Sequence, residues 1–140
     1  MKIILPIIFI FILSSSALKA NDSPDLLTLY KELHAYPELS FKEEKTSKKL
    51  ASMLIDLGFE VTENFAGYGV VALLENGEGK TVMIRADMDG LPVRELTGSS
   101  YASKTKSFNQ VGDEVFTMHA CGHDIHMTSL IGTAINLMER

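Results

Sequence analysis

The feature that most constrains the fold is the apolar run Val82-Met83-Ile84, which lies inside a strand expected over residues 81–86. Consecutive apolar residues without alternation are typical of a strand that is covered on both faces. An interior strand of this kind needs neighbouring strands, and helices need a whole sheet to cover. We therefore expect residues 81–86 to lie inside a covered sheet.

Hydrophobic periodicity predicts three helices. The first begins near Pro24 and ends before Pro37. The second has capping-box spacing at Ser40 and Glu43 and stops at Gly58. The third is an amphipathic helix after residue 126.

Two further strands are expected over residues 59–62 and 70–74. The Asn-Gly-Glu-Gly sequence at 76–79 predicts a hairpin that pairs residues 70–74 with 81–86. Residues 91–117 are too polar and aperiodic to be assigned an element.

The apolar stripe of the third helix is still running at Arg140, and no Gly, Asn or Pro follows to end it. Three helices and three strands also make a poor closed core. We expect the chain to be the first part of a longer protein. The alternative is a complete small domain whose last helix frays.

Residues 1–20 have the pattern of a signal peptide, which leaves residues 21–140 as the mature segment. Lys2 gives a positive start, residues 3–13 are apolar, and small residues follow. An apolar run of that length is too short to span a membrane, which takes about 20 residues. Cleavage is expected after Ala17 or Ala20, and an uncleaved anchor is the alternative. The mature protein would be periplasmic or secreted, with no stable membrane insertion.

Charge and cysteine content exclude several classes of protein. The chain has 13 basic and 18 acidic side chains, a net charge of −5, and removal of Lys2 and Lys19 leaves −7. This balance gives no basic surface for nucleic acid. A single cysteine, Cys121, cannot form an internal disulfide.

The densest chemistry lies in residues 118–126, which hold three of the four histidines and the only cysteine. The sequence there is Met118-His119-Ala120-Cys121-Gly122-His123-Asp124-Ile125-His126. Thiolate and imidazole are preferred ligands of zinc and similar ions, and a glycine between them lets the backbone turn. Asp124 has the chemistry to orient a ligating imidazole. The alternative is a buried thiol with histidines that cap a helix.

Two carboxylates, Asp87 and Asp89, follow the apolar run. Side chains two residues apart in an extended segment share a face, so both can point into one cleft. Catalytic groups of open α/β sheets gather at the carboxyl ends of strands. The alternative is an Asp-rich turn closed by Gly90 and Pro92.

Together these segments resemble a known family, the dinuclear-metal amidohydrolases of the aminoacylase and carboxypeptidase type. The branch with hippurate hydrolase and the auxin–amino acid conjugate hydrolases is the most similar. Four features match in order: Leu33-His34 with Pro37-Glu38-Leu39, residues 85–92, Tyr101-Ala102-Ser103, and residues 118–126.

The resemblance implies an α/β sandwich with a central, mainly parallel sheet, of which this chain is the incomplete N-terminal part. It implies two divalent ions (zinc, manganese, cobalt or nickel), with Cys121 and His123 as metal ligands. Asp89 corresponds to the catalytic-site acid that orients a ligating group. His119, His126 and Asp87 receive no ligand role. The family's catalytic glutamate, its remaining ligands and its dimerisation domain would lie beyond residue 140.

The resemblance thus predicts an exported, metal-dependent amidohydrolase that cleaves N-acyl amino acids or related conjugates and is a homodimer at full length. This chain alone would be inactive. The alternatives are a truncated paralogue without catalysis and an exported metal-binding fragment, because two ligands are fewer than the three of a typical catalytic zinc site.

Overall fold

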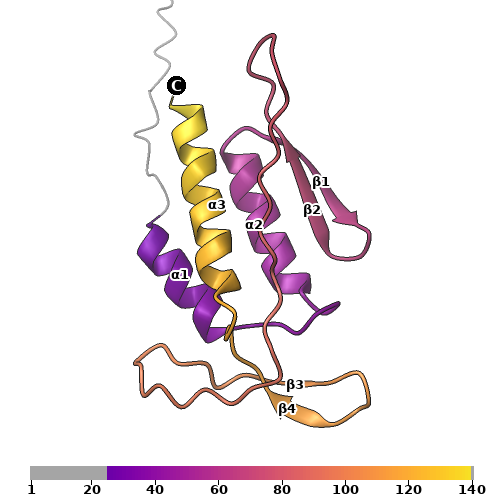
Figure 1. Cartoon of the computed structure of the whole chain (residues 1–140), viewed down its shortest axis with the longest axis vertical. Coiled ribbons are helices and arrows are strands. Elements are labelled where there is room, and N and C mark those ends of the chain that lie inside the picture. The colour runs from indigo at the N-terminus through magenta and orange to yellow at the C-terminus, as the bar shows by residue number, and fades with distance from the viewer. Residues whose placement is uncertain (1–24, 140) are drawn as a thin grey trace, which may run out of the picture.

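The computed structural model describes residues 25–139 (Figure 1). The predicted signal peptide, residues 1–20, lies outside these described residues. Within residues 25–139, no helix has the length and apolar character needed to cross a membrane.

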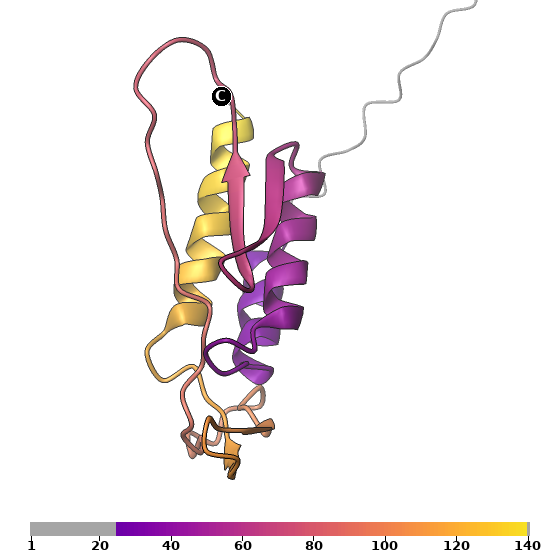
Figure 2. The same cartoon turned by 90° about the vertical axis from the view of Figure 1, so that its right-hand side faces the viewer.

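Three helices form one layer: α1 (Leu26–Ala35), α2 (Glu44–Asp56) and α3 (His123–Met138). Helix α3 packs against both α1 and α2, and the three lie side by side in Figures 1 and 2. Their facing sides bury an aliphatic core of Leu29, Leu33, Leu50, Leu54, Met127, Ile131, Ala134 and Ile135. The apolar periodicity of the sequence therefore predicted all three helices.

The start of α2 differs from the predicted capping box. Helix α2 begins at Glu44, so Ser40 lies too far upstream to cap it, and Glu43 makes no side-chain cap bond. Instead the Glu38 carboxylate accepts hydrogen bonds from the backbone N–H groups of Lys45 (3.2 Å) and Thr46 (2.8 Å). The orphan donors of the first turn are thus satisfied by a residue from the preceding loop.

A two-stranded antiparallel sheet, β1 (Glu60–Phe65) with β2 (Gly69–Leu73), packs against α2. A second antiparallel pair, β3 (Lys106–Phe108) with β4 (Glu114–Phe116), lies at the end of the molecule where α3 begins (Figure 1). The region 91–117, to which no element was assigned, therefore contains a hairpin. Its strands are three residues each, too short to show a period.

The prediction of a strand at residues 81–86 is wrong for the described part of the chain. Strand β2 pairs with β1, and residues 74–86 form a long loop that stands away from it (Figure 2). Val82 and Met83 are 81% and 87% exposed. An apolar run becomes a covered strand only if strands lie beside it, and within residues 25–139 none does. An open groove of about 940 Å³ lies between this loop, β2 and α3.

A junction around Gly90 joins distant segments. The Gly90 N–H donates to the Glu38 carbonyl (2.6 Å), and Leu91 and Met118 exchange two backbone hydrogen bonds (2.8 and 3.0 Å). A Cβ atom at Gly90 would lie 2.8 Å from the Cβ of Pro37, so only glycine permits this approach. The junction places the Asp87–Asp89 segment beside the segment that leads into α3.

Candidate metal and active site

The sequence 118–126 turns sharply into α3 at Gly122. Gly122 is the N-cap residue, has φ +78°, and donates its N–H to the carbonyl of His119 (3.2 Å). A side chain in this left-handed conformation would be strained. As predicted, glycine lets the chain turn here, and His123 becomes the first residue of the helix.

His123 faces Asp89. Its Nδ1 lies 2.9 Å from the Asp89 carbonyl oxygen and 3.1 Å from Oδ1 of the same residue. Both oxygens are acceptors, so Nδ1 donates, and the lone pair of the neutral ring lies on Nε2. A carboxylate that fixes the tautomer and leaves the other nitrogen free is the usual arrangement of a metal-ligating histidine.

Asp87 and Asp89 share one space, as predicted. Both line an open pocket of about 260 Å³ between the β1–β2 turn and the loop before α2. Asp87 also accepts a hydrogen bond from the side chain of Arg85. Residues 81–89 contain no turn or bend and lead into the Gly90 junction, so the alternative of a simple Asp-rich turn does not hold.

Cys121 is exposed and forms no disulfide. The alternative of a buried structural thiol is therefore wrong. The exposed thiol, two residues before His123 in the chain, remains accessible to a ligand.

His119 is 4% exposed, and neither ring nitrogen has a hydrogen-bond partner. Burial lowers the pKa of His119, which favours the neutral form of the ring. A buried polar group without a partner costs free energy. This histidine lies in the predicted motif, but its burial could not be read from the sequence.

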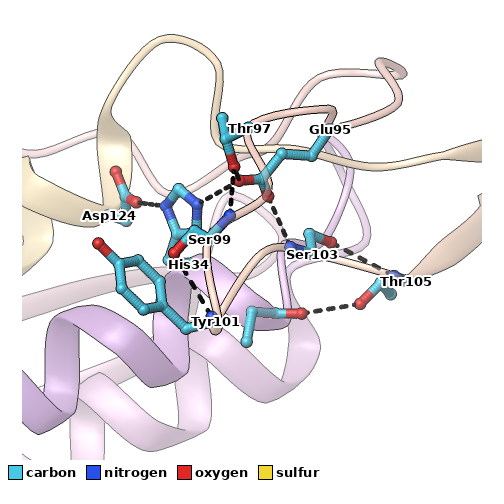
Figure 3. A network of polar contacts seen from close by, with 9 residues as sticks. His34, Glu95, Thr97, Ser99, Tyr101, Ser103, Thr105 and Asp124 are labelled. Atoms are coloured by element: carbon cyan, nitrogen blue, oxygen red, sulfur yellow. Dashed lines mark hydrogen bonds and ion pairs between the residues drawn. The ribbon is translucent and has the colours of Figure 1, made fainter.

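A buried polar network joins α1 to the first turn of α3 (Figure 3). His34 Nδ1 lies 2.7 Å from Asp124 Oδ2, and its Nε2 lies 3.1 Å from Glu95 Oε1. Glu95 also accepts hydrogen bonds from the Ser103 N–H (2.6 Å) and the Thr97 hydroxyl. Asp124 thus orients an imidazole, as the sequence suggested, but the imidazole belongs to His34 and not to a predicted metal ligand.

The charges of this network stabilise one another. Burial by itself lowers the pKa of His34, but the bonds to Glu95 and Asp124 outweigh it and raise that pKa. Burial of Glu95 acts to raise its pKa, but bonds from Thr97, His34 and Ser103 hold the pKa below its usual value. Sequence reasoning missed Glu95, because a lone acid in an aperiodic stretch carries no pattern.

The donors present fit a divalent ion by type but not by number. The chain offers Nε2 of His123, the exposed thiol of Cys121 and the unpartnered ring of His119, all suited to zinc-like ions. Within residues 25–139, however, no three His, Cys, Asp or Glu side chains come together in a way that could hold an ion. The ligand roles of Cys121 and His123, and the role of Asp89, remain predictions.

No family model matches the chain. Individual proteins do match it. It is 42% identical to thermostable carboxypeptidase 1 of Saccharolobus solfataricus, over 81% of this chain and 27% of that protein. It is 40% identical to N-acetylcysteine deacetylase of Bacillus subtilis (82% and 28%) and 40% identical to hippurate hydrolase of Campylobacter jejuni (79% and 29%).

A solved structure of a dinuclear metal-binding peptidase of the M20 family, from Bacillus subtilis, superposes with a TM-score of 0.70. The sequence identity is 39%, over 82% of this chain and 30% of that one. The resemblance to dinuclear-metal amidohydrolases is confirmed.

The chain is homologous to the N-terminal part of these M20 hydrolases, which act on amide bonds, and the α/β class is confirmed by the match in fold. It spans less than a third of the length of the M20 relatives it matches. The sheets of residues 25–139 are antiparallel pairs, so the mainly parallel sheet expected from the M20 resemblance is not formed by these residues alone.

Proposed function

We propose that this chain is the N-terminal, metal-binding part of an M20 amidohydrolase that cleaves N-acyl amino acids or related conjugates. The observation that carries the proposal is the contact between His123 Nδ1 and Asp89, at 2.9 and 3.1 Å. The contact lies in a chain 39% identical to a dinuclear metal-binding peptidase. Two relatives are named for hydrolysis of N-acyl amino acids, hippurate and N-acetylcysteine.

In this proposal Cys121 and His123 hold the metal and Asp89 orients His123. The remaining ligands of the dinuclear site would come from the part of the full-length protein beyond residue 140. The chemistry supplied at such a site is ionisation of water near neutral pH and polarisation of the amide carbonyl. Asp89 keeps the His123 proton on Nδ1, so Nε2 stays available. The exposed Cys121 supplies a thiolate that a borderline-soft ion prefers to a hydroxyl.

Metal content tests the ligand assignment. Dialysed protein would be analysed for zinc, manganese, cobalt and nickel in the wild type, Cys121→Ser and His123→Gln. Asn136→Ala is the control, because Asn136 is exposed and lies near the opposite end of α3 from His123. We expect less bound metal in the first two variants and no change in the control. Equal stoichiometry in all four proteins would refute the assignment.

Substrate turnover tests the activity. We expect the full natural protein to release glycine from hippurate or cysteine from N-acetylcysteine, and Cys121→Ser to abolish release. A protein that binds metal but hydrolyses neither these nor other N-acyl amino acids would support the second candidate, a non-catalytic metal-binding protein. That candidate is favoured by the absence, within residues 25–139, of three ligands that come together.

We also propose that the protein is exported and, at the length of its relatives, a homodimer. Export rests on the charge, apolar run and small residues of positions 1–20. N-terminal sequencing of protein from the cell envelope should start at residue 18 or 21. An intact Met1 in cytoplasmic protein would refute export, and a monomeric mass in sedimentation would refute the dimer.

A further inference from the structure

His34 is held between two buried carboxylates that come from distant parts of the chain. Its ring nitrogens face Asp124 Oδ2 at 2.7 Å and Glu95 Oε1 at 3.1 Å, and the side chains of Asp124 and Glu95 are 2% and 0% exposed. Each carboxylate is an acceptor when ionised, so both ring nitrogens donate and His34 is an imidazolium. Tyr101 packs against the ring at a centroid distance of 5.3 Å (Figure 3). Tyr30 packs against it at 5.6 Å, so the two tyrosines confine the ring.

The network is anchored on the side away from α3. Glu95 accepts bonds from the Ser103 N–H and the Thr97 hydroxyl, so its position is set by its own loop. His34 is carried by α1, whose apolar side is buried in the core. Asp124 is thus held by a cation that is itself fixed from two directions.

The side chain of Asp124 also ties down the first turn of α3. Its Oδ1 accepts the N–H of Ile125 at 2.9 Å, while Oδ2 meets His34. The N-cap, Gly122, offers no side chain to hold this turn. The carboxylate also lies at the positive end of the helix dipole, which stabilises it.

We propose that His34 is a positioning residue that, through Asp124, sets the orientation of His123. His123 directly precedes Asp124 in the same turn, so a shift of that turn moves the His123 ring relative to Asp89. This inference rests on the proposed function, because it assigns the network to the metal site. It adds α1 and the 95–103 loop to the elements that determine the geometry of that site.

The test uses Co²⁺ as the probe on the full natural protein, with affinity read from the thiolate-to-cobalt absorption band. The variants are His34→Gln and Asp124→Asn, which keep most of the side-chain volume. Leu54→Ala is the control, because Leu54 is buried in the same helical core but lies on α2, whereas the network residues come from α1, α3 and the 95–103 loop. We expect the Co²⁺ Kd to rise about tenfold in both network variants, as for other partners that orient ligands. The control should keep the wild-type Kd and band.

A second readout needs no metal. In protein with ¹⁵N-labelled histidine, NMR should detect the Nδ1 proton of His123 that is hydrogen-bonded to Asp89. Its resonance should shift or broaden in His34→Gln but not in Leu54→Ala. Should the wild type bind no Co²⁺, the metal site itself would fail, and this resonance alone would decide the positioning role. Unchanged Kd and resonance in folded network variants would overturn the inference, as would equal losses in the Leu54→Ala control.

Discussion

Two regions of the molecule show the reverse of the burial expected from residue type: one buries charged side chains, and the other exposes apolar ones. Around His34, charged groups lie buried: the side chains of Asp124 and Glu95 are 2% and 0% exposed. At residues 82–84, apolar side chains lie in solvent, with Met83 at 87%. Burial is tolerated in the first region because each of its charged groups has a hydrogen-bonded partner. The second is exposed because, within residues 25–139, no strand lies beside it.

The difference shows that partners in space decide burial in this molecule, and that residue type alone does not. A buried charge is tolerated when it is paired and hydrogen-bonded. An apolar run stays exposed when nothing covers it, and such a run beside an open strand edge favours association with other chains. Four predictions follow this contrast between the network and the loop.

The largest effect is expected from Asp124→Ala. Removal of one partner leaves His34 buried with a single carboxylate, and breaking a buried ion pair in this way costs about 3–5 kcal/mol. Urea denaturation would measure the loss in the free energy of unfolding. Asp56→Ala, at an exposed aspartate of α2, is the control and should change stability by less than about 0.5 kcal/mol. Equal values for the two variants would mean that the network does not contribute to stability.

A smaller effect is expected from pH, because titration changes charge but removes no side chain. The pKa of His34 is raised, so its stabilisation is present below its usual value of 6.5 and is lost as pH rises through the raised pKa. The pKa of Glu95 is lowered, so its contribution is present above 4.5 and is lost as pH falls through the lowered pKa. His119, with a lowered pKa, acts in the opposite sense to His34.

Comparison with His34→Gln isolates the His34 contribution. The stability difference between the wild type and this variant should be largest near pH 5–6 and should shrink as pH rises above the usual range of histidine. Asn136→Ala, at an exposed side chain of α3 that does not titrate, should keep the wild-type profile. A pH-independent difference would contradict the double ion pair at His34.

The third effect concerns ordinary core packing. Ile131 is fully buried, so Ile131→Val should cost about 0.5–1.5 kcal/mol. Val82→Ala removes methyl groups from a side chain that is 81% exposed and should cost less than about 0.5 kcal/mol. Thermal unfolding of the two variants measures both. A larger loss at Val82 than at Ile131 would place residues 82–84 in a core.

Oxidation of Met83 should change stability least of all, because the side chain is exposed, and the quantity measured is its rate of oxidation. In the 140-residue chain, dilute peroxide should convert this exposed methionine to the sulfoxide well before Met127, which is 1% exposed. Peptide mass spectrometry follows both side chains in one sample. Protection of Met83 equal to that of Met127 would show that another surface covers the loop.

Patterns within about twenty residues were predictable from the sequence. The apolar stripes gave α1, α2 and α3, and Gly58 and Gly122 marked turns whose left-handed φ values, +92° and +78°, only glycine adopts freely. The motif 118–126 and the pair Asp87 and Asp89 were singled out as candidates from residue type, spacing and their combined resemblance to a known family.

Contacts between distant residues were not predictable in this way. Ser40 and Glu43 have capping-box spacing, but the Glu38 carboxylate caps α2, because the chain turns at Phe41 with φ +62°. Glu95 has no neighbour in sequence that suggests its role. The burial of His119 and the exposure of residues 82–84 both depend on what lies nearby in three dimensions.

The pair of His34 and Asp124 has a consequence for the timing of folding. The two residues are 90 positions apart in sequence. At a synthesis rate of about 5–20 residues per second, Asp124 is made roughly 5–18 s after His34. The α1 segment is therefore made several seconds before the carboxylate that pairs with its histidine, so the ion pair between His34 and Asp124 can form only late in synthesis.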